Sequence, residues 1–328
     1  MTTGNRTSRS TNRLRRRIEW FAARLLIGSA RRASACGAHR LARVLGNAAW
    51  LVLRKRRAEA KANVRTAFPA APAWDRARIV RSSFRSLALT IVEALRLPES
   101  PPQVRWSEPD VLEPIIRTER PAIILGGHLG NWELAAWAIA RRGGRLHLVV
   151  APPHNPFVAR FMDEHRRRCG VVPHDRNSSV RPLLAALRRS ELVGTAADQF
   201  PGWTIGVRAR DSMVNVPFLR RETAFGTGMF RLALSARVPV LALNAVRCGE
   251  LNDGTEHQFE VVSELIWDGE PPLPTEADMV RRWSAWLELE IRAHPEQYLW
   301  LHRRWKRTAP VANSPFVRVS AEVHPSSE

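Results

Sequence analysis

Short apolar runs alternate with amphipathic stretches along most of the chain, and this alternation predicts the fold class. Four runs of four to nine residues are suited to buried strands and too short for buried helices. They lie at 122–125, 145–150, 191–197 and 238–246. Apolar residues recur at helical spacing in the segments between them. Strands that alternate with helices predict an α/β protein, with a mostly parallel central sheet flanked by helices.

The stretch 121–144 joins the first of these strands to a glycine-rich turn and a helix. Asn131 can cap that helix, and Gly143 can end it. His128 therefore lies on a turn between a strand and a helix, a place where α/β proteins position reactive groups. Because imidazole titrates near neutral pH, we interpret His128 as a general base.

Two carboxylates can orient this imidazole. Glu133 lies five residues further on, about 500° around a helix, but its side chain can fold back if His128 sits on the turn before the helix. Asp198, followed by Gln199, ends the predicted strand at 191–197. Because parallel strands end at the same edge of a sheet, Asp198 also comes within reach of His128. The sequence does not decide between the two acids.

Positive charge is concentrated near the N-terminus. The chain has a net charge of +20, and residues 1–61 hold 16 lysines and arginines against two acidic residues. Leu14, Ile18, Phe21 and Leu25 fall on one helical face beside a stripe of arginines. This pattern predicts a helix that lies on an anionic membrane surface. A surface helix packed on the protein's own core is the alternative, because amphipathicity does not distinguish lipid from core.

The cysteines, the apolar runs and the histidines indicate the compartment and the kinds of site to expect. Three cysteines without paired spacing fit a reducing compartment. Neither a cleavable signal peptide nor a run of 18 apolar residues occurs. The histidines lack metal-ligand spacing, so we expect no metal site.

A basic nucleic-acid-binding protein without catalytic activity is the alternative to an enzyme. No nucleic-acid module signature is present, so we expect no nucleic-acid partner. A hydrolase would need a G-x-S-x-G elbow, which is missing.

Two motifs at opposite ends of the predicted domain resemble one family. The motifs are GHLGNWE at 127–133 and PEQYLWLHRRWK at 295–306. They are similar to signatures of the bacterial lipid A lauroyl and myristoyl acyltransferases and of the related phosphatidylinositol mannoside acyltransferases. The resemblance implies a glycerolipid-acyltransferase-like fold. The resemblance covers about residues 60 to 307. It implies a membrane-associated O-acyltransferase that moves a fatty acyl chain from an acyl thioester to a hydroxyl of a lipid or glycolipid, such as a lipid A precursor in lipopolysaccharide synthesis. The donor would be acyl carrier protein or coenzyme A, with no further cofactor.

The resemblance also implies roles for individual residues. His128 would be the catalytic base, held by Glu133 or Asp198. Residues expected to contact substrate are Asn131, Gln199, Arg168, Arg176, Arg247, Arg303 and Arg304. Guanidinium groups suit phosphate geometry, but the sequence leaves open which arginine on or after the helix that begins at Pro156 would bind it.

These expectations define three segments. Residues 1–60 form a basic, amphipathic, membrane-proximal segment, 61–307 an acyltransferase domain, and 308–328 a flexible tail. The predicted location is the cytoplasmic face of the inner (plasma) membrane, with peripheral or monotopic attachment. The sequence does not identify the acceptor: a Kdo-bearing lipid A precursor, a phosphoinositol mannoside and an ornithine lipid all fit.

Overall fold

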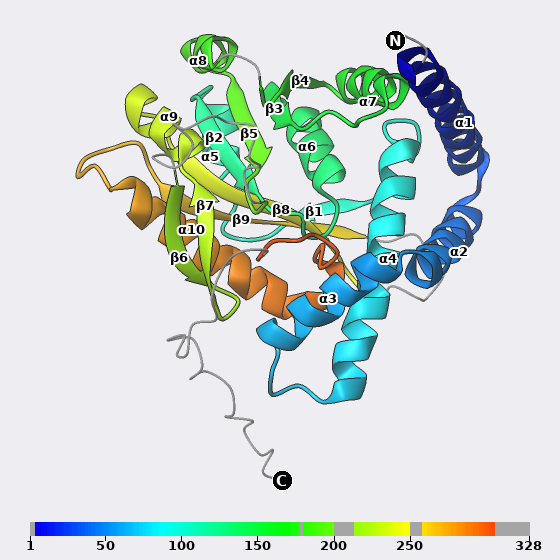
Figure 1. Ribbon diagram of the computed structural model, residues 1–328. Coiled ribbons are helices and arrows are strands. Elements are labelled where there is room, and N and C mark those ends of the chain that lie inside the picture. Colours follow the sequence, from blue (N-terminus) through cyan, green and yellow to red (C-terminus); the bar gives the residue numbers. More distant parts are fainter. Residues whose placement is uncertain (1–3, 178–179, 200–212, 250–257, 306–328) are drawn as a thin grey trace.

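A seven-stranded sheet forms the centre of the molecule (Figure 1). The computed structural model describes residues 4–177, 180–199, 213–249 and 258–305, with side chains from residue 13. In spatial order the strands are β1 (Val104–Trp106), β9 (Phe259–Trp267), β8 (Val240–Arg247), β2 (Ala122–Gly126), β5 (Leu192–Ala196), β3 (Leu146–Val150) and β4 (Val171–Asp175). The five strands from β8 to β4 are parallel, whereas β9 runs antiparallel to β8 and parallel to β1. The predicted mostly parallel α/β fold is confirmed, and the four predicted strands are β2, β3, β5 and β8.

Helices cover both faces of the sheet, which explains why its central strands are apolar runs without alternation. Ile124 of β2 faces one core with α5 (Glu113–Arg117) and α6 (Trp132–Arg141). Ile123 and Leu125 face the other core, to which several further helices contribute. Those helices are α3 (Arg54–Ala67), α4 (Ala73–Arg96), α8 (Arg181–Arg188), α9 (Gly228–Ala236) and α10 (Glu276–Ala293). A separate hairpin, β6 (Met213–Phe218) and β7 (Arg221–Gly226), packs against α10.

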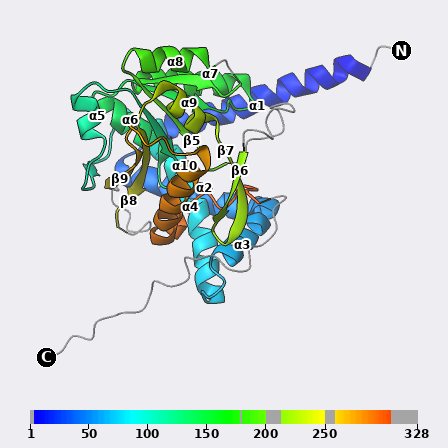
Figure 2. The same ribbon diagram turned by 90° about the vertical axis from the view of Figure 1, so that its left-hand side faces the viewer.

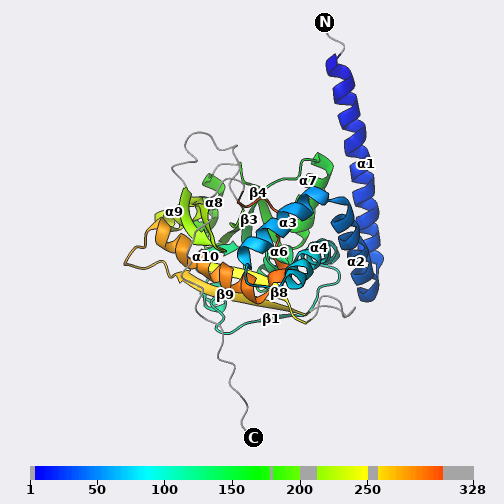
Figure 3. The ribbon, with the colours of Figure 1, turned by 60° about the horizontal axis from the view of Figure 1, so that its bottom comes forward.

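Two N-terminal helices lie along one side of this domain. α2 (Ala35–Val52) packs on α4. α1 (Gly4–Arg32) contacts α4 near its C-terminal end and α7 (Pro156–Arg168) from its middle, where Trp20 packs against Phe157 and Phe161, while its N-terminal end extends away from the body (Figure 3). The turned view in Figure 2 shows the same projection. In the described residues, no helix is long and apolar enough to cross a membrane.

The C-terminal segment returns to the glycine-rich turn after β2. It starts with the 3₁₀ helix η2 (Pro295–Gln297). Gly130 N–H donates to the Gln297 carbonyl at 3.1 Å, and Leu299 N–H donates to the His128 carbonyl at 3.0 Å. The two predicted motifs, more than 160 residues apart, are therefore in contact. The predicted flexible tail, 308–328, lies outside the described residues.

Candidate active site

The turn that carries His128 has a fixed backbone. At Gly130 the φ angle is +66°, and an added Cβ would lie 1.9 Å from the Ala245 carbonyl oxygen, so only glycine fits there. Asn131 N–H donates to the same carbonyl at 2.8 Å. Gly127 N–H donates to Asn244 Oδ1 at 2.9 Å. The strand β8 thus holds the turn at both ends and fixes the position of the imidazole.

Asp198 is the carboxylate that binds this imidazole. His128 Nδ1 lies 2.6 Å from Asp198 Oδ1, and the His128 backbone N–H donates to Asp198 Oδ2 at 3.1 Å. Asp198 lies two residues after the end of β5, the strand next to β2, as expected from the parallel sheet. An ionised carboxylate accepts the Nδ1 proton, so the lone pair of the neutral imidazole is on Nε2. This is the arrangement that a general base needs.

The surroundings of Asp198 keep it ionised. Burial by itself would raise its pKa, but the charge and hydrogen bonds of His128, together with the charge of Arg304, lower the pKa to about 2. Tyr298 shares a side-chain hydrogen bond with Asp198, and burial raises the pKa of this phenol well above its usual range. Tyr298 is therefore a neutral donor to the carboxylate.

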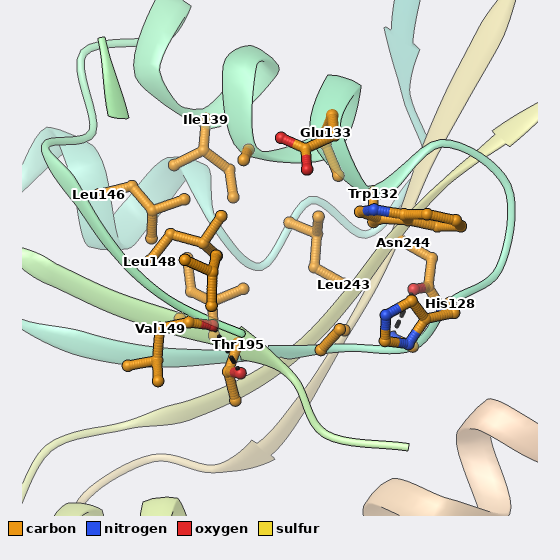
Figure 4. A pocket seen from close by; sticks show the side chains of 18 of the residues that line it. His128, Trp132, Glu133, Ile139, Leu146, Leu148, Val149, Thr195, Leu243 and Asn244 are labelled. Carbon is orange, nitrogen blue, oxygen red and sulfur yellow. Dashed lines mark hydrogen bonds between the residues drawn. The ribbon is translucent and has the colours of Figure 1, made fainter. Parts of the chain in front are cut away.

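A cavity of about 460 Å³ opens between α6 and the sheet, with His128 at one end (Figure 4). Trp132 stands beside His128, with ring centroids 4.9 Å apart. The far end is apolar and is lined by Ile139, Leu146 and Leu148. A volume of this size suits a substrate-sized ligand. The cavity thus combines a basic nitrogen with an apolar interior.

Glu133 does not bind His128. Its carboxylate lies at the cavity wall and accepts from Arg166 at 2.6 and 3.0 Å, a bidentate pair from α6 to α7. Burial would lower the pKa of Arg166, but Glu133 outweighs that effect and raises it. Glu133 lies in the first turn of α6 and its carboxylate binds Arg166 of α7, so of the two candidate acids it is Asp198 that contacts His128.

The predicted substrate contacts fall into three groups. Gln199 and Arg176 line the cavity, and Gln199 Nε2 lies 3.1 Å from His128 Nε2. Arg168 and Arg303 are away from the cavity wall and pair with Glu99 and Glu59 respectively. The other three predicted contacts, Asn131, Arg247 and Arg304, are buried.

Each of these three buried residues has a partner within the protein, and contact with substrate stays a prediction for them. Asn131 caps α6 by accepting from Leu134 N–H at 3.0 Å. Arg247 ends β8 as expected, but α4 covers it there, and its guanidinium binds Glu93 at 2.5 Å. Arg304 donates to the Ala224 carbonyl at 2.8 Å and stacks on Phe225.

The aromatic residues of the C-terminal motif pack inward. Trp300 and Trp305 are buried in the main core, and Trp305 Nε1–H donates to Thr223 Oγ1 at 2.8 Å. Burial of a large aromatic side chain contributes much of the free energy that stabilises a core. The tryptophans of this motif are therefore part of the core that supports the site.

Sequence reasoning did not single out Arg166 and Asn244. Arg166 was one of several clustered arginines on α7, and nothing in that cluster distinguishes the one that faces Glu133. Asn244 did have a signal: it is a polar residue within an apolar run buried on both faces, where an amide needs a specific partner. That partner is the backbone N–H of Gly127.

None of the three cysteines lines the cavity. Cys169 is buried in the core beside α6, and burial raises the pKa of its thiol to about 11. A thiol with such a pKa is almost wholly protonated at neutral pH, so it is a poor nucleophile. The cavity offers an imidazole base and no cysteine nucleophile.

The chain is similar to known proteins over most of its length. Residues 7–307 match the family model described as bacterial lipid A biosynthesis acyltransferase. The chain is 28% identical to a lipid A biosynthesis palmitoleoyltransferase of Escherichia coli (strain K12) over 285 residues, which is 82% of this chain and 85% of that protein. It is 25% identical to a lipid A biosynthesis myristoyltransferase of the same strain over 284 residues, 84% of this chain and 82% of the relative. A lipid A biosynthesis acyltransferase of Haemophilus influenzae is 26% identical over 269 residues, with 80% of each chain covered.

Proposed function

Because the chain belongs to the bacterial lipid A biosynthesis acyltransferase family, we propose that it transfers a fatty acyl chain from an acyl thioester to a hydroxyl of a lipid A precursor, with His128 as general base. The observation that carries this proposal is the His128–Asp198 pair at the polar end of a cavity with an apolar interior. Acyl transfer to a hydroxyl requires a base for the hydroxyl proton and an adjacent apolar site for the acyl chain.

The chemistry follows from the hydrogen bonds of His128. Nε2 takes the proton of the acceptor hydroxyl while that oxygen attacks the thioester carbonyl carbon. The ionised Asp198 stabilises the imidazolium that forms. When the tetrahedral intermediate collapses, the C–S bond breaks and the imidazolium returns its proton to the departing thiolate. Transfer is direct, because no side chain in the described cavity is arranged as a nucleophile.

The walls of the cavity suggest where the two substrates lie. The acyl chain occupies the apolar end between α6 and the sheet, where Ile139 and Leu146 remove it from water. Arg176 is exposed at the cavity wall, whereas Arg166, which also lines the cavity, is paired with Glu133. The Arg176 guanidinium is therefore placed to bind an anionic group of the donor or acceptor.

The N-terminal helix supports a location on the cytoplasmic face of the inner membrane. Leu14, Ile18, Phe21 and Leu25 are all exposed on α1, between 58% and 64%. The stripe therefore does not pack on the described core, which disfavours the alternative that α1 is an ordinary surface helix. Anionic lipids attract basic segments by roughly 1 kcal/mol for each lysine or arginine near the surface.

The test is transfer of one acyl chain to a Kdo-bearing lipid A precursor in mixed micelles, followed by mass spectrometry. Acyl carrier protein and coenzyme A thioesters are supplied separately, so the same experiment identifies the donor. General-base catalysis contributes about 10²- to 10⁴-fold, so His128→Gln is expected to lose at least that factor while it keeps its fold. His154→Gln, a change in an exposed histidine outside the cavity, serves as the control. Equal activity of the two variants would refute the role of His128.

A further inference from the structure

The reactive nitrogen of His128 already has a partner in this structure. Because Asp198 holds the Nδ1 proton, Nε2 presents a lone pair, and the group 3.1 Å away is the side-chain amide nitrogen of Gln199. An amide N–H is a donor, so it donates to the lone pair that would take a proton during transfer. Gln199 is half-buried and lines the same cavity.

This contact occupies the place of a substrate. A hydroxyl that gives its proton to Nε2 must come to about 2.6–3.2 Å from that atom. Gln199 Nε2 stands within that range, so the hydroxyl and the amide cannot hold the same lone pair together. The acceptor must displace the Gln199 amide before His128 can act.

The same reasoning applies to water. If water reached Nε2 beside a bound thioester, His128 would take its proton while the oxygen attacked the carbonyl carbon. The C–S bond would then break, and the thiolate would recover the proton, leaving a free fatty acid and a thiol. This hydrolysis would waste the donor, and the chemistry of His128 does not by itself prevent it.

We propose that Gln199 caps the general base in the absence of acceptor and so makes the enzyme a transferase that hydrolyses its donor slowly. The proposal rests on the function proposed above. A lipid acceptor that binds over the cavity gains enough contact area to displace one hydrogen bond, whereas a single water molecule gains little more than the bond that it replaces. Gln199 thus determines which hydroxyl is activated.

The experiment measures donor hydrolysis without acceptor, and transfer with acceptor, for the wild-type chain and for Gln199→Ala and Gln199→Leu. A hydrogen bond of ordinary net strength corresponds to roughly a 2- to 10-fold effect, so hydrolysis should rise by that factor in both variants. Transfer should fall less than hydrolysis rises, and the ratio of transfer to hydrolysis should decrease. Gln103→Ala makes the same chemical change at an exposed glutamine outside the cavity and should leave the ratio as it is.

Two results would overturn the cap. Unchanged hydrolysis in both variants would show that the Gln199 contact does not restrain the base. Parallel loss of hydrolysis and transfer would make Gln199 a catalytic donor instead. Leucine fills the volume of glutamine without a donor, so agreement between the two variants separates loss of the hydrogen bond from loss of packing. Failure of the proposed function is a different result, because the wild-type chain would then show no transfer that depends on His128.

Discussion

His128 forms hydrogen bonds through its backbone as well as its ring, and the partners come from two distant parts of the chain, residues 198–199 and Leu299. Its N–H and Nδ1 both go to Asp198, its carbonyl accepts from Leu299, and Nε2 accepts from Gln199. Rotation of the ring would break the hydrogen bonds at Nδ1 and Nε2. In the proposed mechanism, this restraint reduces the need to orient the base during the reaction.

Asp198→Asn should reduce both activity and acid-dependent stability. The amide cannot hold the imidazole in the same tautomer or stabilise imidazolium, so kcat should fall about 10²- to 10⁴-fold. The pKa of Asp198 is lowered from 3.8 to about 2 in the folded chain. Its contribution to stability is therefore full above pH about 4 and is lost as the pH falls towards about 2.

Urea denaturation at a series of pH values measures this contribution. The shift corresponds to roughly 2 kcal/mol, so the wild-type chain should lose about that much more stability than Asp198→Asn between pH about 4 and 2. Parallel stability curves for the two proteins would show that the carboxylate is not held as the structure indicates.

Glu133→Gln should destabilise the fold because Arg166 loses its bidentate partner and keeps only the longer contact with Asp163 at 3.8 Å. The two side chains are only 14% and 11% exposed, and removing one partner of a pair this buried costs roughly 3 kcal/mol. Glu99→Gln breaks a comparable pair with Arg168, but there the side chains are 44% and 51% exposed, so the loss should stay below about 1 kcal/mol. Urea denaturation of both variants makes the comparison. Equal losses would mean that burial does not decide the strength of these pairs.

At the scale of elements, predictions succeeded where the apolar pattern was strong. The run 122–125 became β2 because every residue in it is buried. β4 escaped prediction because Pro173 interrupts its run, and it is tolerated there because β4 is an edge strand. α3 is polar around most of its surface, so the periodicity that identifies a helix is weak in 54–67.

Prediction of the site also succeeded where a local pattern was sufficient and failed where packing between distant segments decides the structure. The parallel order of β2 and β5 predicted that His128 and Asp198 would meet. The predicted strand 238–246 is followed by Arg247, which is the last residue of β8, but the pattern did not predict that α4 covers this strand end and places Glu93 against the guanidinium. Which helix covers a strand end depends on packing between distant segments. The local sequence pattern of one strand does not contain that information.

The turn between β2 and α6 should tolerate no side chain at its last glycine. Gly130→Ala would combine a left-handed backbone with a Cβ at 1.9 Å from a carbonyl oxygen, so we expect destabilisation of at least about 2 kcal/mol. Gly228 begins α9 with nothing within 4 Å of an added Cβ. Gly228→Ala should therefore be neutral or stabilise by up to about 1 kcal/mol. Thermal unfolding of both proteins tests the contrast, and similar unfolding temperatures would contradict it.

At the scale of the whole molecule, charge and apolar exposure occur together at one end. The N-terminal 61 residues carry most of the excess positive charge, and α1 within them projects from the domain with its apolar stripe uncovered. Its C-terminal part packs through Ala30, Ile27 and Leu26 against α2 and α4. Because that packed part does not include the stripe, the stripe can change without loss of the contacts that hold α1 to the domain.

Serine at Leu14, Ile18, Phe21 and Leu25 together should therefore weaken membrane binding and leave the fold intact. Burying one such side chain is worth about 1.5 kcal/mol or more, so losing four should lower partitioning into anionic phospholipid vesicles by at least about tenfold. The residual binding should come from the arginines and should disappear as salt rises, since exposed charges are screened. A matched control replaces Leu273 and Leu289, which are 54% and 57% exposed elsewhere on the molecule, with serine. Vesicle co-sedimentation at low and high salt compares the proteins. If the stripe variant binds as the control does, the apolar face of α1 is not what meets the bilayer.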